Sequence, residues 1–308
     1  MPDATKRTLA ELITLHELEP DLKEIITEGR SDASVVRWFL RRSGIDAAVY
    51  GISDRLDIPP TEVRRRGQLV GNKGRVIASA LGIQEDSGVA ASGVTFIYDA
   101  DDDFLTGATT PRADCLLRTD YTSMEMYAFA NNVLDKMLKV TLRDNGDLDA
   151  EEVLTSISAP LVALAFCRLV LSEIDPPVGL IGAIERRCRF VGGRMTIDVN
   201  ALILDSVNSA GGATSLGVSI AGLLSEQQIR MDACTLDIRL IIRGHDFTQI
   251  CCHFLRTVYP SLFREDRAPH RQPGTFEGAL MTCLEWSDLA SQGLFKELLG
   301  RVGAVGAT

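Results

Sequence analysis

The stretch Val94-Thr95-Phe96-Ile97-Tyr98-Asp99-Ala100-Asp101-Asp102-Asp103 decides the fold expected for this chain. Its first five residues are apolar, β-branched or aromatic, a composition typical of a buried strand. Four carboxylates then follow within five residues. In an open α/β sheet, ligands bind just beyond the carboxyl ends of the strands. Carboxylates gathered there repel one another unless a cation or water relieves them. The stretch therefore indicates a buried strand that ends at a cation site.

The preceding sequence predicts a βαβ unit. The segment Lys23–Thr27 (Lys-Glu-Ile-Ile-Thr) is interpreted as a strand that ends at Glu28 and Gly29. A helix over Asp32–Arg42 follows, with Ser31 as its N-cap, and the next strand spans Ala47–Ile52. This order predicts the α/β class, with a mostly parallel sheet flanked by helices.

Three acidic segments are expected to meet at one edge of this sheet. If the first and third strands are neighbours, Glu28 faces the carboxylates of Asp99–Asp103. Asp99 and Asp101 are expected on the same side of an extended backbone, so that both reach one hard cation. Asp32 lies in a first helical turn, where the helix dipole stabilises a carboxylate. Glu125 follows a further predicted strand, so we expect a site for one or two hard cations.

Each of these residues also has a simpler interpretation. Asp102 and Asp103 are equally consistent with a solvated turn, and Asp32 with an ordinary helix-start charge. Lys73, near the start of a predicted helix, either contacts a phosphate or lies on the surface. The run of three arginines, Arg64, Arg65 and Arg66, either contacts a nucleic-acid backbone or forms a solvated charged face.

Composition and patterning limit the alternatives. The 308 residues carry a net charge of −10, which argues against a nonspecific DNA coat but permits a local basic groove. Seven cysteines without a Cys-x-x-Cys pair, and four scattered histidines, predict no zinc site. The start lacks the pattern of a signal peptide, and the apolar segments at 159–167 and 206–224 are expected inside a protein, not a membrane. A cytoplasmic location is expected.

The pattern changes near residue 130. Residues 1–130 alternate predicted strands and helices, whereas residues 131–308 show long helical periods without clear strand alternation. We expect an α/β catalytic domain followed by a helical C-terminal region. Trp38 and Trp286 lie in apolar helical patterns and are expected in the core.

The acidic motifs resemble a known family. Glu28-Gly29-x-x-Asp32 after the first strand, Asp99-x-Asp101 after a later strand and an acidic residue downstream resemble the Toprim domain of topoisomerases, bacterial primases and overcoming-lysogenization-defect nucleases. The chain is more similar to Toprim-like proteins that accompany ABC-type ATPases in bacterial anti-phage defence, including the nuclease effector of PARIS systems. Residues 20–130 carry most of this resemblance. The further motifs that carry it are Gly71-Asn72-Lys73, Thr119-Asp120-Tyr121 and Arg243-Gly244-His245-Asp246.

The resemblance implies roles for the acidic residues. The position of Glu28 implies a metal ligand or general acid–base, and Asp99 and Asp101 would hold Mg²⁺ or Mn²⁺. Asp32, Asp103 and Glu125 would complete the metal site, with Lys73 beside the reacting phosphate.

The resemblance also implies a function and partners. The expected protein is a Mg²⁺-dependent endonuclease that cleaves tRNA or DNA. It would be a homodimer when active, and a partner ABC-type ATPase would control it. The alternative is a regulatory protein that binds such an ATPase and whose acidic site is degenerate or only structural.

Overall fold

The computed structural model describes residues 6–86, 93–109, 111–181, 184–192 and 194–303. The chain divides into two compact units. The first unit comprises residues 1–124 and 285–308, and the second comprises residues 125–284. The α/β class, the parallel sheet and the helical C-terminal region expected from the sequence are confirmed.

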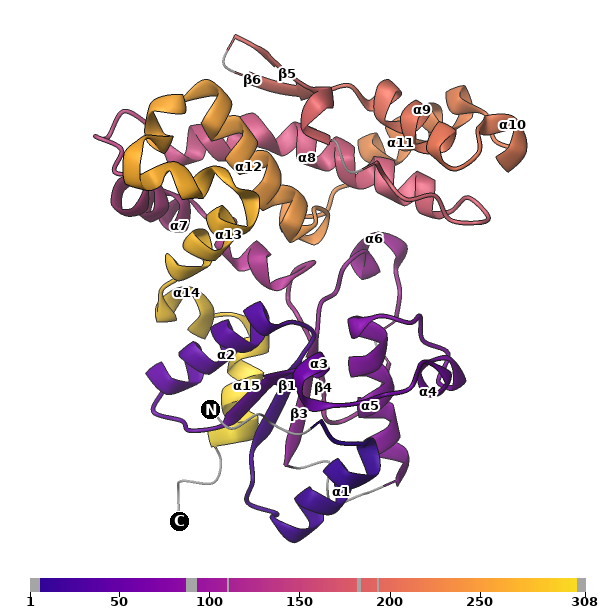
Figure 1. Ribbon diagram of the computed structural model, residues 1–308, viewed down its shortest axis with the longest axis vertical. Coiled ribbons are helices and arrows are strands. Elements are labelled where there is room, and N and C mark those ends of the chain that lie inside the picture. Colours follow the sequence, from indigo (N-terminus) through magenta and orange to yellow (C-terminus); the bar gives the residue numbers. More distant parts are fainter. Residues whose placement is uncertain (1–5, 87–92, 110, 182–183, 193, 304–308) are drawn as a thin grey trace. The chain divides into compact units, whose positions relative to one another are not determined.

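The first unit is built on a four-stranded parallel sheet in the order β2-β1-β3-β4 (Figure 1). The strands are β1 (Glu24–Thr27), β2 (Ala48–Gly51), β3 (Val94–Tyr98) and β4 (Leu116–Arg118). The helices are α1 (Leu9–Leu18), α2 (Arg30–Arg42), α3 (Ile52–Arg55), α4 (Pro60–Arg65), α5 (Asn72–Asp86), α6 (Asp103–Thr106), α14 (Trp286–Ala290) and α15 (Gly293–Gly303).

The register brings the carboxyl ends of the strands to one edge. Thr27 pairs with Ile97 of β3 and with Gly51 of β2, and Tyr98 pairs with Arg118. The chain runs from β1 to β2 on one side and then returns to β3 on the other. The order of the strands therefore reverses between β1 and β3, which is where α/β sheets open a crevice for ligands.

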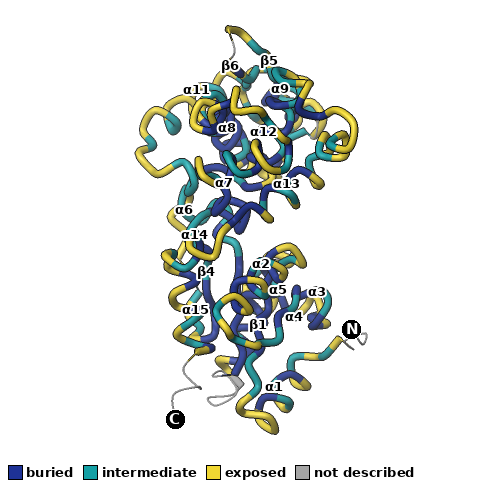
Figure 2. The backbone as a smooth tube through the Cα atoms, turned by 90° about the vertical axis from the view of Figure 1, so that its left-hand side faces the viewer, coloured by how far each residue is buried: buried dark blue, intermediate teal, exposed yellow. Residues whose placement is uncertain are grey.

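Helices cover both faces of the sheet (Figure 1). On one face α2 packs against β1 and β2, and its Phe39 ring lies 4.6 Å from the Phe295 ring of α15. On the other face α5 packs against β3 and shares a core with Ile26 and Phe96. Every residue of β1 and β3 is buried, as expected for strands that are covered on both faces (Figure 2).

Residues 285–308 return to the first unit, although the sequence pattern placed them in the C-terminal region. The Asp120 carboxylate, just beyond β4, accepts the backbone N–H of Leu294 at 3.0 Å and so caps α15. Trp286 stacks on Phe39 with ring centroids 6.0 Å apart, and its indole N–H donates to Ser43 at 2.8 Å. Trp286 and Trp38 are 39% and 37% exposed, so the expectation that both are core residues is wrong.

The second unit is mainly helical. Its helices are α7 (Asn131–Lys136), α8 (Ala150–Ser172), α9 (Val199–Ser209), α10 (Ala213–Leu216), α11 (Ile220–Ala233), α12 (Gly244–Val258) and α13 (Pro273–Thr282). Short helical turns are η2 (Met124–Ala128), η3 (Met137–Thr141), η4 (Ile184–Arg187), η5 (Ile238–Leu240), η6 (Pro260–Phe263) and η7 (Glu265–Arg271). A hairpin of β5 (Cys188–Val191) and β6 (Arg194–Ile197) was not expected, because its residues are mostly half-exposed or exposed and carry little apolar alternation.

Helix α8 forms the centre of the second unit. It is long and apolar enough to cross a membrane, but 61% of its most apolar window is buried inside the protein. It packs against α9, α11, α12 and β6. Arg168, within the apolar run, makes two hydrogen bonds of 2.7 Å to the buried carboxylate of Asp246. The apolar composition of α8 is therefore accounted for by its burial in the core of the second unit.

Candidate active site at the carboxyl edge of the sheet

Glu28 and Asp99 lie side by side at the reversal point of the sheet. Each is the first residue after its strand, β1 or β3. The Oε1 atom of Glu28 accepts a hydrogen bond of 2.8 Å from the backbone N–H of Asp99. The first and third strands are neighbours, as expected from the sequence. The acidic segments that follow them therefore converge.

The turn after β1 is held by its own polar groups. Helix α2 begins at Arg30 with Gly29 as its N-cap, so the expected cap at Ser31 is wrong by two residues. The Asp32 carboxylate is buried and accepts the N–H of Gly29 at 2.9 Å. Gly51, at the end of β2, approaches this turn so closely that a Cβ atom there would lie 3.2 Å from the Gly29 carbonyl carbon. Glu28 is therefore presented by a tightly packed turn.

The turn after β3 differs from the extended backbone that the sequence suggested. Strand β3 ends at Tyr98, and Asp101 has a φ of +49°, in the left-handed region. Aspartate tolerates this region better than most residues. The Asp101 N–H donates to the Thr122 carbonyl at 2.7 Å, and the Ala100 N–H donates to the Thr119 hydroxyl at 3.0 Å. The carboxylates of this segment are therefore positioned by a turn locked to the segment after β4, not by strand alternation.

Lys73, from the first turn of α5, reaches this acidic turn. Its ammonium donates to the Ala100 carbonyl and to the Asp103 carboxylate, both at 3.0 Å, and lies 3.3 Å from the Asp101 carboxylate. Burial opposes the charged form, but Asp101 and Asp103 outweigh it and raise the pKa of Lys73. Lys73 is therefore a charged member of the site, and the interpretation as an isolated surface lysine does not apply.

The pKa of the Glu28 carboxyl is strongly shifted. Burial raises the pKa of its carboxyl to about 8. The Asp99 N–H and Lys73 oppose this rise, while the negative charges of Asp101 and Asp32 add to it. A carboxyl that is buried among like charges favours either a proton or a nearby cation. The donor set is therefore suited to a hard divalent ion bound by oxygen atoms.

Arg118 is a member of the site that sequence reasoning missed. It ends β4, and its Nη1 atom lies 4.0 Å from Oδ2 of Asp103. Its guanidinium also lies 4.5 Å from the centre of the Phe104 ring. The sequence could have indicated Arg118 by its position at the end of a predicted strand, close to the acidic residues that follow β3.

Glu125, predicted to join the metal site, is the first residue of the second unit. There it lies near two other possible ligands. His245 Nδ1 is 3.8 Å from Glu125 Oε1 and 2.9 Å from Glu277 Oε2. The hydrogen bond with Glu277, together with the charge of Glu125, raises the pKa of His245 to about 9. Because these three residues are far apart in sequence, no local spacing predicted this group.

The three arginines predicted to bind nucleic acid have different environments. Arg66 is only 4% exposed in its side chain and forms ion pairs with Glu62 and Glu85. It is a structural residue, so its predicted role in binding phosphate is not supported by its position. Arg65 pairs with Glu62 at 3.0 Å on the surface, and Arg64 is exposed.

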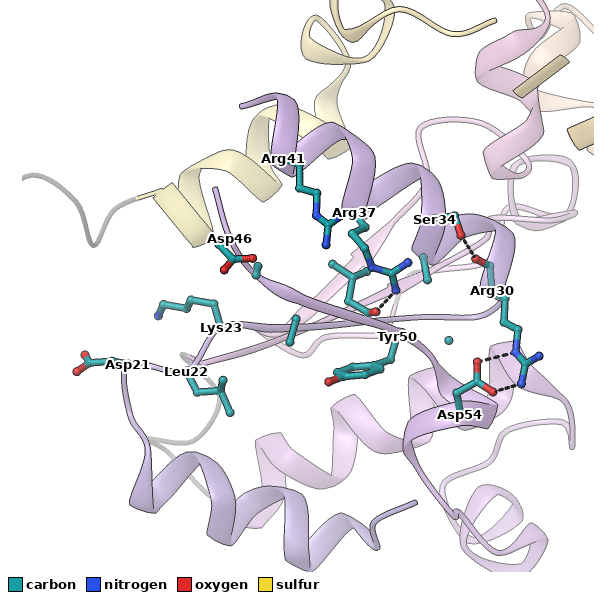
Figure 3. Close-up of a pocket in the computed structure, with 15 residues that line it drawn as sticks. Asp21, Leu22, Lys23, Arg30, Ser34, Arg37, Arg41, Asp46, Tyr50 and Asp54 are labelled. Carbon is teal, nitrogen blue, oxygen red and sulfur yellow. Dashed lines mark hydrogen bonds and ion pairs between the residues drawn. The ribbon is translucent and has the colours of Figure 1, made fainter. Parts of the chain in front are cut away.

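A groove of about 760 Å³ lies along β2, the edge strand of the sheet (Figure 3). Arg30, Arg37 and Arg41 of α2 line it together with Lys23 and Tyr50. Arg30 pairs with Asp54 through hydrogen bonds that include one of 2.7 Å, and Arg37 donates to the Val49 carbonyl. Asp21 and Asp46 also line the groove. It begins beside the turn that carries Glu28 and is a better candidate than Arg64–Arg66 for contacts with a polyanion.

Neither the protein-family models nor the curated protein sequences contain a match to this chain. Its function is therefore argued from the site itself.

Proposed function

We propose that this chain is a Mg²⁺-dependent nuclease whose active site lies at the carboxyl edge of the sheet in the first unit. The observation that carries the proposal is the hydrogen bond between Glu28 and the Asp99 N–H. It joins two acidic strand ends into one site and involves a half-buried carboxyl whose pKa is raised to about 8. Perturbed carboxyls at the ligand-binding edge of a sheet are a feature of catalytic sites.

Glu28, Asp99 and Asp101 are the residues that would hold Mg²⁺ or Mn²⁺, with Asp32 and Asp103 supporting them. When bound, the ion would polarise the phosphodiester and stabilise the leaving oxygen. The site offers such an ion carboxylate oxygens from two turns that are held by hydrogen bonds, with Lys73 as a nearby positive charge.

The protein's own groups would do the remaining work. A carboxyl with a pKa near neutrality is well matched to proton transfer, so Glu28 is the proposed general acid–base. Lys73 is held by Ala100 and Asp103 and would place a positive charge beside the phosphate. Arg118, next to Asp103, would add a second cation.

The substrate proposed is a nucleic acid, either tRNA or DNA. Support comes from the groove along β2, where Arg30, Arg37, Arg41 and Lys23 combine with the ring of Tyr50 (Figure 3). Basic side chains that follow a backbone, together with an aromatic ring for stacking, suit single-stranded segments. Control by a partner ABC-type ATPase, a dimeric active form, a cytoplasmic location and a role in phage defence rest on the family resemblance alone.

The test is cleavage of mixed tRNA and plasmid DNA by the purified chain with Mg²⁺ or Mn²⁺, with and without a chelator. Glu28→Gln and Asp99→Asn are each expected to reduce cleavage by at least about 100-fold. Asp114→Asn is the matched control, because Asp114 is an exposed carboxylate just before β4, at the opposite edge of the sheet. Cleavage by Glu28→Gln at the wild-type rate would reject the site.

A second candidate function is favoured by Lys73. Its ammonium already neutralises part of the acidic turn through Asp101 and Asp103, which suits a structural site in a protein that only binds an ATPase partner. The two functions differ in their response to metal. A nuclease site should raise the melting temperature in Mg²⁺ or Mn²⁺, and Glu28→Gln should abolish the rise; a purely structural site should show none.

A further inference from the structure

Glu125, His245 and Glu277 bring three metal-binding side chains together in the second unit. They belong to three different elements, η2, the first turn of α12, and α13. One donor atom from each lies within 4.8 Å of the other two. The group combines an imidazole nitrogen with two carboxylate oxygens and is separate from the donor set of Glu28, Asp99 and Asp101.

The distances suit a shared ion better than a simple hydrogen-bonded triad. His245 Nδ1 and Glu277 Oε2 are at hydrogen-bond distance, 2.9 Å, but Glu125 Oε1 is 3.8 Å from the same nitrogen. Glu125 is 5% exposed, so its carboxylate is buried and lies beyond hydrogen-bond distance of the imidazole nitrogen. Donors around a tetrahedral Zn²⁺ at ~2.1 Å lie about 3.4 Å apart, between the two observed separations.

Glu277 is further oriented by Thr248. The Thr248 hydroxyl lies 3.1 Å from Glu277 Oε2 and 3.2 Å from the His245 carbonyl oxygen. Outer contacts of this kind fix the direction of a ligand, and their loss typically weakens metal binding by about 10–100-fold. Thr248 would therefore act as a positioning residue.

We propose that Glu125, His245 and Glu277 form a binding site for one Zn²⁺ ion in the second unit. An imidazole ligand favours Zn²⁺ over Mg²⁺, and two carboxylates balance the charge of a divalent ion. Three protein ligands leave one tetrahedral position open, as in zinc sites that bind water or a substrate group. The exposed imidazole of His245 places this open side toward solvent.

The experiment measures zinc bound to the full chain after chelator treatment and equilibrium dialysis. It uses the double variant Glu28→Gln/Asp99→Asn, which removes two of the three carboxylates proposed to hold the ion of the nuclease site. We expect one equivalent of Zn²⁺, not displaced by millimolar Mg²⁺. His245→Gln and Glu277→Gln in this background should weaken binding at least tenfold, and Thr248→Val should weaken it measurably. His253→Gln is the matched control, because His253 lies on the same helix, 3.7 Å from Glu185, and should leave binding unchanged.

A second measurement leaves Glu125, His245 and Glu277 unchanged, so it does not depend on the folding of a variant of these ligands. With Co²⁺ in place of Zn²⁺, the proton NMR spectrum of the same double variant should show shifted ring resonances from one coordinated imidazole. The proposal is overturned if no stoichiometric Zn²⁺ binds, if no imidazole resonance is shifted, or if the His245 and Glu277 variants bind like the parent. Because the nuclease site is disabled in every sample, these outcomes are independent of whether the chain cleaves nucleic acid.

Discussion

The side chain of Glu28 accepts the backbone N–H of Asp99 at 2.8 Å, across 71 positions of sequence. This contact exists because β1 and β3 pair in parallel and end at the same level, with Thr27 opposite Ile97. Each acidic residue is therefore the first beyond its strand. The bond holds the half-buried Glu28 carboxyl among other carboxylates, and its removal from solvent raises its pKa.

Replacing Glu28 by Gln is expected to stabilise the metal-free protein at high pH. Burial raises the pKa of Glu28 to about 8, so the folded state retains a proton that the unfolded state loses near pH 4.5. Wild-type stability should therefore fall as the pH rises through this interval. An amide keeps the acceptor for the Asp99 N–H but does not ionise, so Glu28→Gln should be more stable at pH 9 by on the order of 2 kcal/mol.

Urea unfolding at pH 5, 7 and 9 in the presence of a chelator checks this expectation. Glu17→Gln, on the exposed surface of α1, serves as the control and should follow the wild type. Parallel stability curves for Glu28→Gln and the wild type over this range would show that Glu28 is not buried as the structure has it.

Binding of Mg²⁺ is expected to release a proton from Glu28 below pH 8. The ion requires the ionised carboxylate, whereas the metal-free site holds the proton until about pH 8. The apparent affinity should rise by up to about tenfold per pH unit below this value and level off above it. Calorimetry at pH 6.5 in two buffers of different ionisation enthalpy should give close to one proton released per ion.

The same titration at pH 9 is the internal control, since the carboxyl is ionised there and the heat should not depend on the buffer. Binding at pH 6.5 that releases no proton would remove Glu28 from the list of metal ligands.

The local sequence pattern predicted the strands that position the site. The conformations of the turns and the side-chain contacts depend on tertiary packing and were not predicted. The strands that precede Glu28 and Asp99 carry short runs of β-branched and aromatic residues, so their position was readable from sequence. The left-handed backbone of Asp101 was not, because it depends on a hydrogen bond to Thr122. The burial of Arg66 was missed for a similar reason, since Glu85, one of its partners, lies on another helix.

No local sequence pattern indicated the candidate metal site in the second unit. Glu125, His245 and Glu277 are more than thirty residues apart at each step of the sequence and are brought together by three elements. Composition had even argued against a histidine site, because the four histidines are scattered along the chain. Scattering in sequence says little about helices that pack against one another.

Replacing Arg55 by Met is expected to destabilise the first unit by about 3–5 kcal/mol, because it leaves a buried carboxylate without its partner. Arg55 donates to both carboxylate oxygens of Glu24, with the Nη2 bond at 2.9 Å, and the two side chains are 7% and 0% exposed. Burial opposes ionisation, but His16 and Arg55 together lower the pKa of Glu24. A lowered folded-state pKa contributes stability that is present above about pH 4.5 and is lost as the pH falls below it.

Denaturant unfolding at pH 7 and pH 3 measures both effects. The difference between Arg55→Met and the wild type should be large at pH 7 and smaller at pH 3. Arg65→Met is the control, because its pair with Glu62 is exposed and should contribute at most about 1 kcal/mol. Equal effects of the two substitutions would contradict the assignment of the Glu24–Arg55 pair to the core.

Replacing Arg41 by Ala is expected to weaken nucleic-acid binding, whereas the neighbouring Arg42→Ala should not. Both arginines are exposed in the last turn of α2, so both substitutions change helix stability and net charge alike. Only Arg41 lines the groove along β2 (Figure 3). If the Arg41 guanidinium contacts a phosphate, the slope of log affinity against log salt concentration should become smaller in magnitude by about one in Arg41→Ala.

The measurement is an anisotropy titration of a labelled single strand between low and moderate salt. Glu28→Gln is present in every sample to prevent cleavage. A loss of affinity that is the same for Arg41→Ala and Arg42→Ala would place the polyanion elsewhere and leave the groove without a role in the proposed nuclease.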